Sequence, residues 1–473
     1  MFSYLILALV ICYFCLLFGI SRWTGKKATN ETFYRGNRLS PWYMVAFGMI
    51  GASISGVTFV SVPGMVTRID MTYLQTCLGF ILGYVIVAFV LLPLYYRLNL
   101  TTIYSYLGKR LGQHSYKTGA SFFLLSKATG AAVRFYVVCI ILQRFVFDGM
   151  RIPFAMTVAG MVGLIWLYTR KGGIRTLVFT DVLQTTCMYA ALLLIIWQVV
   201  GDLGMSWGEA VCAVAGDEKS QVFVFDDWMS KQYFWKQFLS GAFIVIVMTG
   251  LDQDMMQKNL TCRSLKDAQK NMCTYGVMFV PANLLFLSLG VLLVHWYTTY
   301  GYAIPATGDE LLPVFVEKSS TLILSLFTLG IVAASFSSAD SALTALTTSF
   351  CVDICQRQGD ERLRKRVHAG IAVVFVAFIL SFRVLNSTSI IDAIYILCSY
   401  TYGPLLGLFA FGLLTKRKTN DRLVPYICIA SPVICYLSDW LIGTYTNYRF
   451  GYELLMLNGA LTFIGLFMCK KVD

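Results

Sequence analysis

The chain has 473 residues, of which 57% are hydrophobic and only 13% are charged, whereas soluble domains carry about 25% charged residues. A water-soluble core of this length cannot bury so much apolar surface, which excludes a single soluble domain. The formal net charge of +13 would suit nucleic acid or an anionic substrate, but the positions of the basic residues indicate a different origin for the charge.

Apolar runs long enough to cross a membrane recur along the whole chain. A hydrocarbon layer of roughly 30 Å takes about 20 helical residues. The runs lack the alternating pattern of barrel strands, so each is predicted to be a helix. The first run lacks the basic region and cleavage site of a signal peptide and is expected to be retained. Thirteen spans are predicted, over residues 2–21, 42–66, 73–96, 118–147, 151–170, 174–200, 236–257, 270–297, 320–350, 366–386, 389–415, 423–444 and 453–469.

Basic residues gather in alternate loops between these spans. Because Lys and Arg are enriched in cytoplasmic loops, the pattern predicts an N-terminus outside and a C-terminus in the cytoplasm, which requires an odd number of spans. The loop over residues 201–233 is rich in Asp and Glu and is expected outside. The clustering of Lys and Arg in alternate loops explains the positive net charge, so no nucleic acid partner is needed to account for it. The basic clusters lie within residues 22–38, 97–117, 170–175, 258–270, 357–366, 416–422 and 470–471.

The 14 cysteines and 3 histidines form no recognisable metal site. The cysteines are scattered singly and mostly inside spans, so reduced, buried thiols are a better interpretation than disulfides. His114, His295 and His368 lie far apart in the sequence. A metalloenzyme is therefore poorly supported, and no catalytic constellation of another kind is visible.

Two spans carry small or polar residues at mid-depth. The second contains glycines and serines between Gly48 and Gly56, followed by Pro63; the seventh runs through Gly250 into Asp252. Each is predicted to be a broken helix. Breaks at corresponding positions of two halves indicate a transporter binding site, because unwound carbonyls coordinate cations and half-helix N-termini face anionic groups. Tight helix packing at small residues is the alternative.

Several ionisable residues fall inside the predicted spans, where such groups cost several kcal/mol unless paired or hydrated. Each is therefore a candidate functional residue. Lys127 and Arg134 could equally pair with a carboxylate or snorkel towards an interface. Asp181 could pair with Arg175, although a spacing of six suits one helix poorly. The intramembrane set is Lys127, Arg134, Asp181, Asp340 and Asp392.

The ninth span is rich in serine. Ala334, Ser337, Ser338 and Ser341 share one helical face, with Asp340 on its flank. Hydroxyls and freed carbonyls can replace the water shell of a sodium ion without the charge density that divalent ions attract. The alternative is that the serines hydrogen-bond to their own helix and pack against a neighbour.

An ordered set of motifs resembles the sodium/solute symporter family, which includes carriers of proline, galactose, iodide, pantothenate and sialic acid. The resemblance covers nearly the whole chain. It implies an all-α polytopic membrane protein whose core is two inverted five-helix repeats with two broken helices. The matching segments are ETFYRGNR at 31–38, SISGVTF at 53–59, PG at 63–64, GIRTLVFTDVLQ at 173–184, DQDMMQK at 252–258, SSADS at 337–341 and YGP at 402–404.

The resemblance also implies an organisation of the chain. Residues 1–41 are expected to form the first transmembrane helix and a cytoplasmic lead-in, and residues 42–200 the first repeat. An extracellular loop over 201–235 leads to the second repeat at 236–417, and residues 418–473 contain two further transmembrane helices.

Two sodium sites follow from the resemblance. The main site takes carbonyls from Gly51, Ile54 and Ala334 and hydroxyls from Ser337 and Ser338. A second site, present in some members, would here comprise Asp181, Ser337, Asp340 and Ser341. Asp340 stands where those members have a serine, and two carboxylates near one monovalent ion favour protonation of one of them.

The solute is expected at mid-membrane between the two breaks. The sialic acid carriers hold the carboxylate of their substrate with an arginine on the fourth span, and Arg134 is the matching position. This favours a sialic acid-like acidic sugar; another sugar, a polyol, an amino acid or a carboxylate is the alternative. The matching positions are Ser53, Ser55, Thr58, Gln75, Arg134, Asp252 and Gln253.

The sequence therefore predicts a sodium-coupled symporter of a small organic solute that works by alternating access. It is expected in a plasma or bacterial inner membrane, as a monomer in contact with lipid. A proton-coupled symporter is the nearest alternative, because Asp181 and Asp340 could titrate. A channel, a transporter-derived sensor and a membrane enzyme are less well supported.

Overall fold

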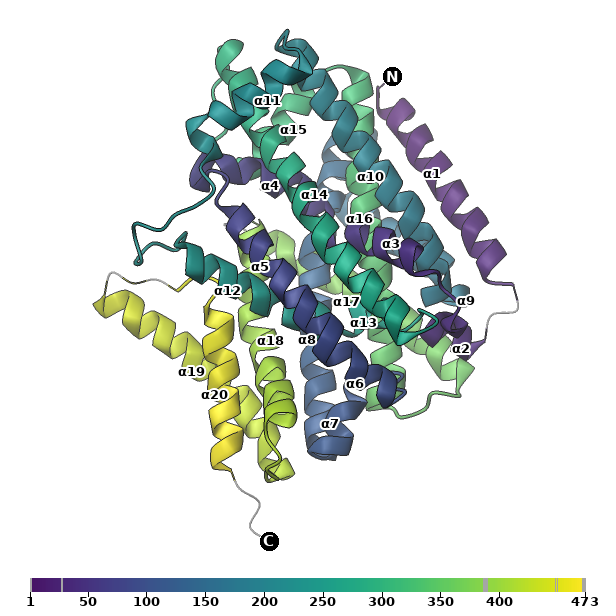
Figure 1. The fold of residues 1–473 in the computed structure, drawn as a ribbon. Helices are drawn as coiled ribbons and strands as arrows, with labels where there is room; N and C mark the ends of the chain where they lie inside the picture. The colour runs from purple at the N-terminus through teal and green to yellow at the C-terminus, as the bar shows by residue number, and fades with distance from the viewer. Residues whose placement is uncertain (1, 27–28, 386–389, 447, 449, 470–473) are drawn as a thin grey trace.

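The computed structural model describes residues 2–26, 29–385, 390–446, 448 and 450–469. Within these residues it contains helices and one isolated bridge, between Ser40 and Cys262, but no β-strand. Figure 1 shows how the helices are arranged. They are α1 (Phe2–Thr24), α2 (Asn30–Arg35), α3 (Trp42–Ser53), α4 (Gly56–Ile69), α5 (Tyr73–Ile86), α6 (Leu92–Arg97), α7 (Ser105–Arg110), α8 (Gln113–Leu142), α9 (Phe154–Gly172), α10 (Ile174–Asp202), α11 (Trp207–Gly216), α12 (Phe234–Val245), α13 (Gln253–Asn259), α14 (Leu265–Thr299), α15 (Leu311–Lys318), α16 (Thr321–Ser349), α17 (Glu361–Leu385), α18 (Ile390–Leu414), α19 (Val424–Tyr445) and α20 (Leu454–Met468).

Each of the thirteen predicted spans coincides with one helix or with consecutive helices. Nine helices in the described ranges are long and apolar enough to cross a membrane, and the number reaches eleven when each of two bent pairs is one span. The other two predicted spans correspond to α9, which carries Arg170 and Lys171 in its last turn, and to α20, which has 15 residues. The predicted polytopic helical fold is confirmed. The difference between the thirteen predicted spans and the eleven of sufficient length and hydropathy is due to α9 and α20.

The second and seventh predicted spans are broken. α3 and α4 meet at 61°, and the segment Phe234–Gly250, which contains α12, meets α13 at 70°. At the first break Ser55 is extended, with φ −77° and ψ 173°; at the second Asp252 has φ −102° and ψ 120°. An extended residue interrupts the helical hydrogen bonds, so carbonyls of one half-helix and N–H groups of the next are free for other partners.

α16 runs through the centre of the molecule. Every residue from Gly330 to Ser349 is buried. The helix packs against α10, α8 and α3 (Figure 1). Its many small residues allow these neighbours to approach closely, which is the usual way that helices associate in a membrane. The serine-rich face therefore meets protein and not lipid.

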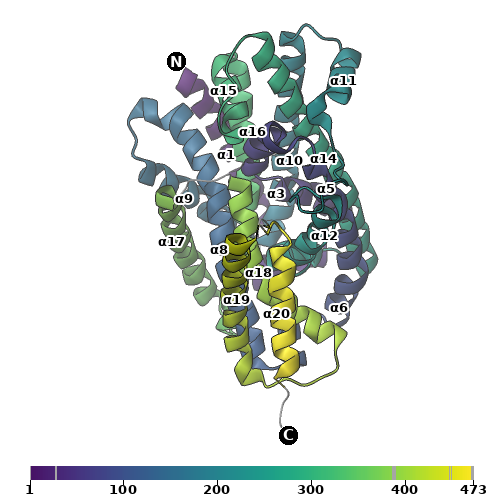
Figure 2. The same cartoon turned by 90° about the vertical axis from the view of Figure 1, so that its left-hand side faces the viewer.

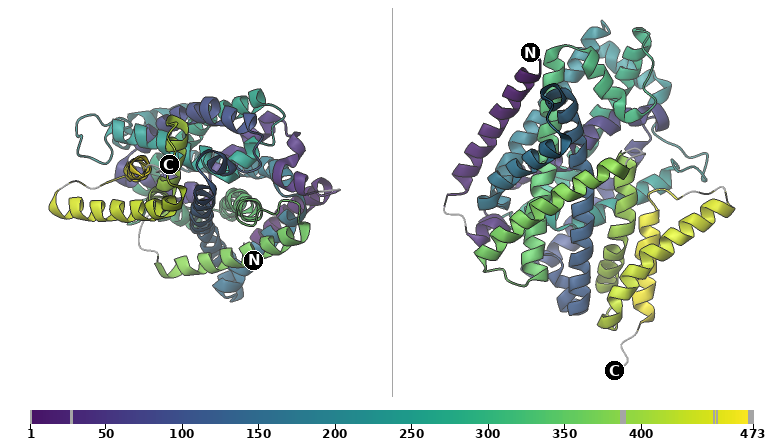
Figure 3. Two further views of the ribbon diagram at one scale, coloured as in Figure 1. Left: turned by 90° about the horizontal axis from the view of Figure 1, so that it is seen from below. Right: turned by 180° about the vertical axis from the view of Figure 1, so that it is seen from behind.

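Helices at the edge of the molecule expose large apolar side chains. α17 and α19 lie on the outside in Figure 2, and Figure 3 shows α19 projecting from the bundle. On α19, Tyr426, Ile429 and Trp440 are each more than half exposed. Such a surface suits contact with lipid chains, because a soluble protein rarely exposes a continuous apolar patch of this kind.

The start of α1 and the end of α20 lie at opposite ends of the molecule (Figure 1). α11 and α15 lie at the end where α1 begins, and α7 lies at the end where α20 finishes. An odd number of crossings arranges the first and last helices in this way, as the sequence predicts.

Candidate functional site

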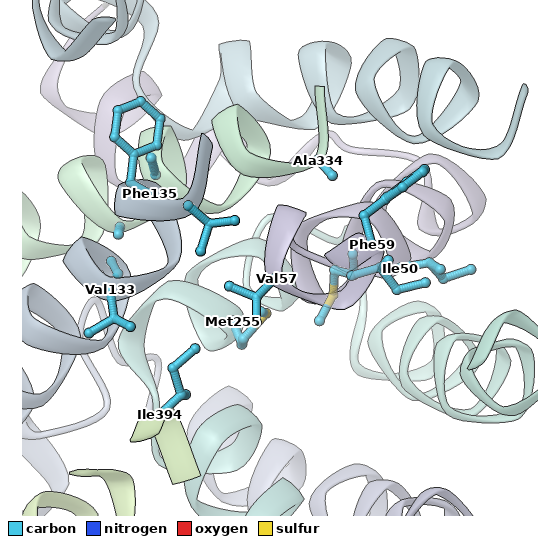
Figure 4. Packing of buried hydrophobic residues seen from close by; sticks show 14 of the residues in the cluster. Ile50, Val57, Phe59, Val133, Phe135, Met255, Ala334 and Ile394 are labelled. Carbon is cyan, nitrogen blue, oxygen red and sulfur yellow. The ribbon is translucent and has the colours of Figure 1, made fainter. Parts of the chain in front are cut away.

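A cavity lies between the two helix breaks. Val57, Met255 and Ile394 form part of its apolar wall, and Figure 4 shows them close together. An apolar pocket with a few polar groups suits a small organic ligand, because the polar groups determine its orientation. The polar lining includes Ser53, Ser55, Thr58, Lys127, Arg134, Asp252, Tyr73, Tyr395 and Tyr402.

Lys127, on α8, is paired with both acidic residues of the second break. Its Nζ lies 2.7 Å from Asp254 Oδ2 and 3.2 Å from Asp252 Oδ2, and the side chain is 6% exposed. Asp252 also accepts a hydrogen bond from the Tyr402 hydroxyl at 2.6 Å and from the N–H of Asp254 at 2.8 Å, so it caps α13. The cluster joins α8, α13 and α18 around the cavity, and the charge of Lys127 is already compensated.

Arg134 has different surroundings. It lies two turns beyond Lys127 on α8 and lines the same cavity. It forms no hydrogen bond or ion pair with any residue that the structure describes. A guanidinium presents several donors in a planar fork that matches a carboxylate. Among the cavity-lining residues that the structure describes, Arg134 is thus a cation without a carboxylate partner.

Three side chains of the first break line the cavity. The Ser53 hydroxyl is hydrogen-bonded to the Tyr275 hydroxyl on α14, which also accepts from Tyr84 at 2.8 Å. The hydroxyls of Ser55 and Thr58 form no hydrogen bond within the described part of the chain. They are free to contact a solute or water.

Gln75 and Gln253 lie outside the cavity lining, although both match solute positions of the symporter family. Gln75 Nε2 donates to the carbonyl of Gln232 at 2.9 Å, and its Oε1 accepts from the N–H of Val224. Gln253 Oε1 accepts from the N–H of Ile103 at 2.9 Å. Because these amides are satisfied by backbone groups, they connect loops to the core.

The first break meets α16 at Ser338. Its Oγ donates to the carbonyl of Ala52 at 2.8 Å and lies 3.4 Å from the carbonyl of Ala334. Ser335 Oγ is buried without a hydrogen-bond partner among the described residues. A Cβ on Gly56 would lie 2.1 Å from this oxygen. The Ser338 hydroxyl thus lies between carbonyl oxygens of α3 and α16, a neutral ligand set that suits a monovalent hard cation.

The other residues predicted for the main sodium site are placed differently. A Cβ on Gly51 would lie 2.0 Å from the Thr185 hydroxyl on α10, so only glycine fits there. The N–H of Ile54 closes the last turn of α3 on the carbonyl of Ile50 at 2.9 Å. Ser337 faces α10, where its Oγ donates to Asp181 Oδ1 at 2.6 Å. The direct partner of Ser338 is Ala52, which the family pattern did not indicate.

Asp181 and Asp340 belong to one buried cluster. Asp181 Oδ2 lies 2.7 Å from Lys258 Nζ, and both side chains are 1% exposed. Asp340 accepts a hydrogen bond from the Tyr168 hydroxyl at 2.5 Å and from Ser341 Oγ at 3.3 Å. The partner of Asp181 is thus Lys258 and not Arg175. The side chain of Asp392 lies outside the described residues.

Two of the basic residues in the predicted loop clusters are buried. Lys258 lies in the core, in the last turn of α13. Arg364 is 3% exposed and lies over the ring of Phe33, 4.3 Å from its centre. Lys258 is the last residue of the segment 252–258, which also contains Asp252 and Asp254. Its presence next to a helix break was the signal that could have identified it.

The cysteines and histidines form no cluster in the described ranges. All 14 cysteines are free. No group of three or more His, Cys, Asp or Glu side chains there could hold a metal ion.

Comparison with protein families gives one match across most of the chain. The model of the sodium:solute symporter family matches residues 33–422. Among solved structures, the fold is similar to a Na⁺-coupled sialic acid symporter in a substrate-bound outward-open state, with a TM-score of 0.83 and 21% identity over 99% of this chain and 97% of that one. It is also similar to Mhp1, a nucleobase-cation-symport-1 family transporter, with a TM-score of 0.61 and 13% identity over 93% and 94%.

Relatives in sequence are sodium-coupled carriers. The sodium/sialic acid symporter NanT of Aliivibrio fischeri is 24% identical over 92% of this chain and 88% of that protein. The sodium/sialic acid symporter SiaT of Proteus mirabilis is 24% identical over 86% and 83%. The human sodium/iodide cotransporter is 22% identical over 84% of this chain and 63% of that protein.

Proposed function

Because this chain belongs to the sodium:solute symporter family, we propose that its solute bears a carboxylate and that Arg134 binds this group. The chain is a multi-pass membrane protein that couples sodium to the transport of a small organic solute. Transport, not catalysis, is its activity. An acidic sugar of the sialic acid class is the favoured solute, since NanT and SiaT are sodium/sialic acid symporters.

The observation that carries this proposal is the contrast between two cations in one cavity. Lys127 is held by Asp252 and Asp254, whereas Arg134 has no partner among the described residues. A carboxylate entering the cavity can pair with Arg134 in a bidentate manner. The open hydroxyls of Ser55 and Thr58 can then bind the hydroxyl groups of the solute.

We propose that sodium binds where α16 meets the first break. The ligands are the carbonyls of Gly51, Ala52, Ile54 and Ala334, with the hydroxyl of Ser338 and the unpaired hydroxyl of Ser335. Bound there, sodium holds the end of α3 against α16 and keeps Ser53, Ser55 and Thr58 in place for the solute. Coupling is then a difference in the affinity of the solute between two conformations.

The two halves of the core support an alternating-access cycle. Each repeat that we propose, 42–200 and 236–417, begins with a broken helix, and the cavity lies between the breaks. Since one chain holds both breaks, we propose the monomer as the transporting unit. When one sodium ion enters with a solute that bears one carboxylate, no net charge crosses the membrane, so the concentration gradient of sodium supplies the driving force.

The chain direction follows from the loop charges. We propose that the N-terminus, the acidic loop over 201–235 and α11 face the outside. The basic segment at 416–422, beyond α18, then faces the cytoplasm, in agreement with the enrichment of Lys and Arg there.

The function is tested by uptake of radiolabelled N-acetylneuraminic acid into proteoliposomes. We expect uptake with an inward sodium gradient and only background when choline replaces sodium. Uptake undiminished in choline would contradict sodium coupling. If this acid is not transported, a sodium-dependent thermal-shift screen of sugars, polyols, amino acids and carboxylates identifies the solute. A response to neutral solutes alone would contradict the role of Arg134.

A further inference from the structure

The second predicted sodium site contains a cation that belongs to the protein itself. The Lys258 ammonium lies 2.7 Å from Asp181 Oδ2, and Ser337 Oγ donates to Oδ1 at 2.6 Å. Gln184 adds a donor at 3.2 Å when its amide nitrogen faces Oδ1. Both oxygens of Asp181 are thus occupied by donors, which come from α13, α16 and α10.

Asp340 completes this cluster on α16, one turn from Ser337. No ion pair within the described ranges reaches it; its partners are the hydroxyls of Tyr168 at 2.5 Å and Ser341 at 3.3 Å. Asp181 thus lies beside the ammonium, whereas Asp340 is bound by hydroxyl groups.

We propose that the Lys258 ammonium permanently occupies the second cation position, so that this transporter binds a single sodium ion, at Ser338. The inference rests on the proposed sodium site, because that site must supply the one ion. A sodium ion exchanges its water for lone pairs of oxygen, but the oxygens of Asp181 already face N–H and O–H groups. The ammonium is also anchored to the fold, so it repels a second cation at every moment of the cycle.

The position of Lys258 in the fold explains how a side-chain ammonium can take the place of a second bound ion. It lies in the last turn of α13, the half-helix after the second break, and pairs with Asp181 on α10. A Cβ on Gly48 of α3 would lie 2.7 Å from the Asp181 Cβ, so α10 also contacts the first broken helix. The ion pair thus connects both broken helices, as an ion shared between them would. Solute accumulation then follows the first power of the sodium gradient.

The number of sodium ions bound tests this inference without knowledge of the solute. We would measure equilibrium binding of ²²Na⁺ to the purified full-length protein. One ion per chain is expected for the wild type, and one for Asp181→Asn. Lys258→Met keeps a side chain of similar length without the charge, and we expect its value to rise to two. Asp353→Asn is the matched control, because it removes another buried carboxylate near the end of α16 and should leave the number at one.

Two results would overturn the inference. Two ions in the wild type, reduced to one by Asp181→Asn, would show that sodium binds beside the ammonium. A value of one in a folded Lys258→Met protein would show that something other than the ammonium excludes sodium. If Lys258→Met does not fold, the wild-type and Asp181→Asn numbers decide. No sodium binding in the wild type would overturn the proposed site at Ser338 as well, which separates the two failures.

Discussion

At the scale of single residues, two cations on α8 that line one cavity differ in their partners. Lys127 is paired with two carboxylates, and Arg134 with no residue that the structure describes. We propose that Lys127 stabilises the fold and that Arg134, two helical turns away, binds the solute. From the sequence, both residues could either pair with a carboxylate or extend towards an interface. Only the tertiary structure shows which carboxylates lie close to each of them.

Replacing Arg134 should therefore impair solute binding and leave the fold intact. Hydrogen bonds to charged groups contribute about 1.5–3 kcal/mol, so Arg134→Gln should raise the KM for N-acetylneuraminic acid by roughly 10- to 150-fold. Arg134→Lys keeps the charge but loses the planar fork, and we expect an intermediate value. Arg144→Gln is the control, since Arg144 pairs with Glu317 and is 42% exposed. An unchanged KM in Arg134→Gln would contradict the assigned role.

Replacing Lys127 should impair the fold itself. Lys127→Met leaves Asp252 and Asp254 buried without their cation, and breaking a buried pair destabilises by about 3–5 kcal/mol. We expect a clear loss of thermal stability in detergent, measured by the unfolding temperature. The double variant Lys127→Met with Asp254→Asn should recover part of that loss. Equal stability of Lys127→Met and the wild type would show that the cluster does not stabilise the protein.

At the scale of the helices, close backbone contacts hold the broken segments in place. A Cβ on Gly64 of α4 would lie 2.0 Å from the carbonyl oxygen of Gly308, beside α15. A Cβ on Gly79 of α5 would lie 2.0 Å from the carbonyl oxygen of Phe238 on α12. Small residues at such crossings allow helices to approach without lipid between them. Tight helix packing was the alternative explanation for small residues in the broken spans. The structure contains both the breaks and such close contacts.

The Gly64 contact can be tested by a matched pair of substitutions. Gly64→Ala must push α4 away from residue 308, because backbone atoms cannot move aside as a side chain can. We expect lower thermal stability and a lower maximal uptake rate. Gly163→Ala on α9 is the control, since its Cβ would meet nothing within 4 Å, and replacing a helical glycine by alanine stabilises by up to about 1 kcal/mol. Equal behaviour of the two variants would contradict the packing explanation.

At the scale of the whole molecule, the start of α1 and the end of α20 lie at opposite ends of the bundle (Figure 1). The proposed direction places α11 outside, and Cys212 on α11 is exposed. A membrane-impermeant maleimide should thus label Cys212 in intact cells, with Cys212→Ser as the unlabelled control. Lys418→Cys, in the Cys212→Ser background, should react only after permeabilisation. The reverse pattern would contradict the proposed orientation.

The sequence by itself determined the class of the protein and the general course of the chain. Apolar runs of about 20 residues cannot remain in water, and a backbone in lipid must form helices. The two breaks were also predictable, since glycine and aspartate at mid-depth oppose a continuous apolar helix. These conclusions depend on neighbours in the sequence, which is why they needed no tertiary structure.

Only the tertiary structure decided which buried charges meet. Lys258 pairs with Asp181 across 77 positions, Lys127 pairs with the residues of the second break, and Arg134 pairs with none of the described residues. It also turned Gln75 and Gln253 away from the cavity and towards backbone groups. The physical reason is that an ion pair or a hydrogen bond acts over about 3 Å in space, and helix packing, not the order of residues, determines which groups come that close.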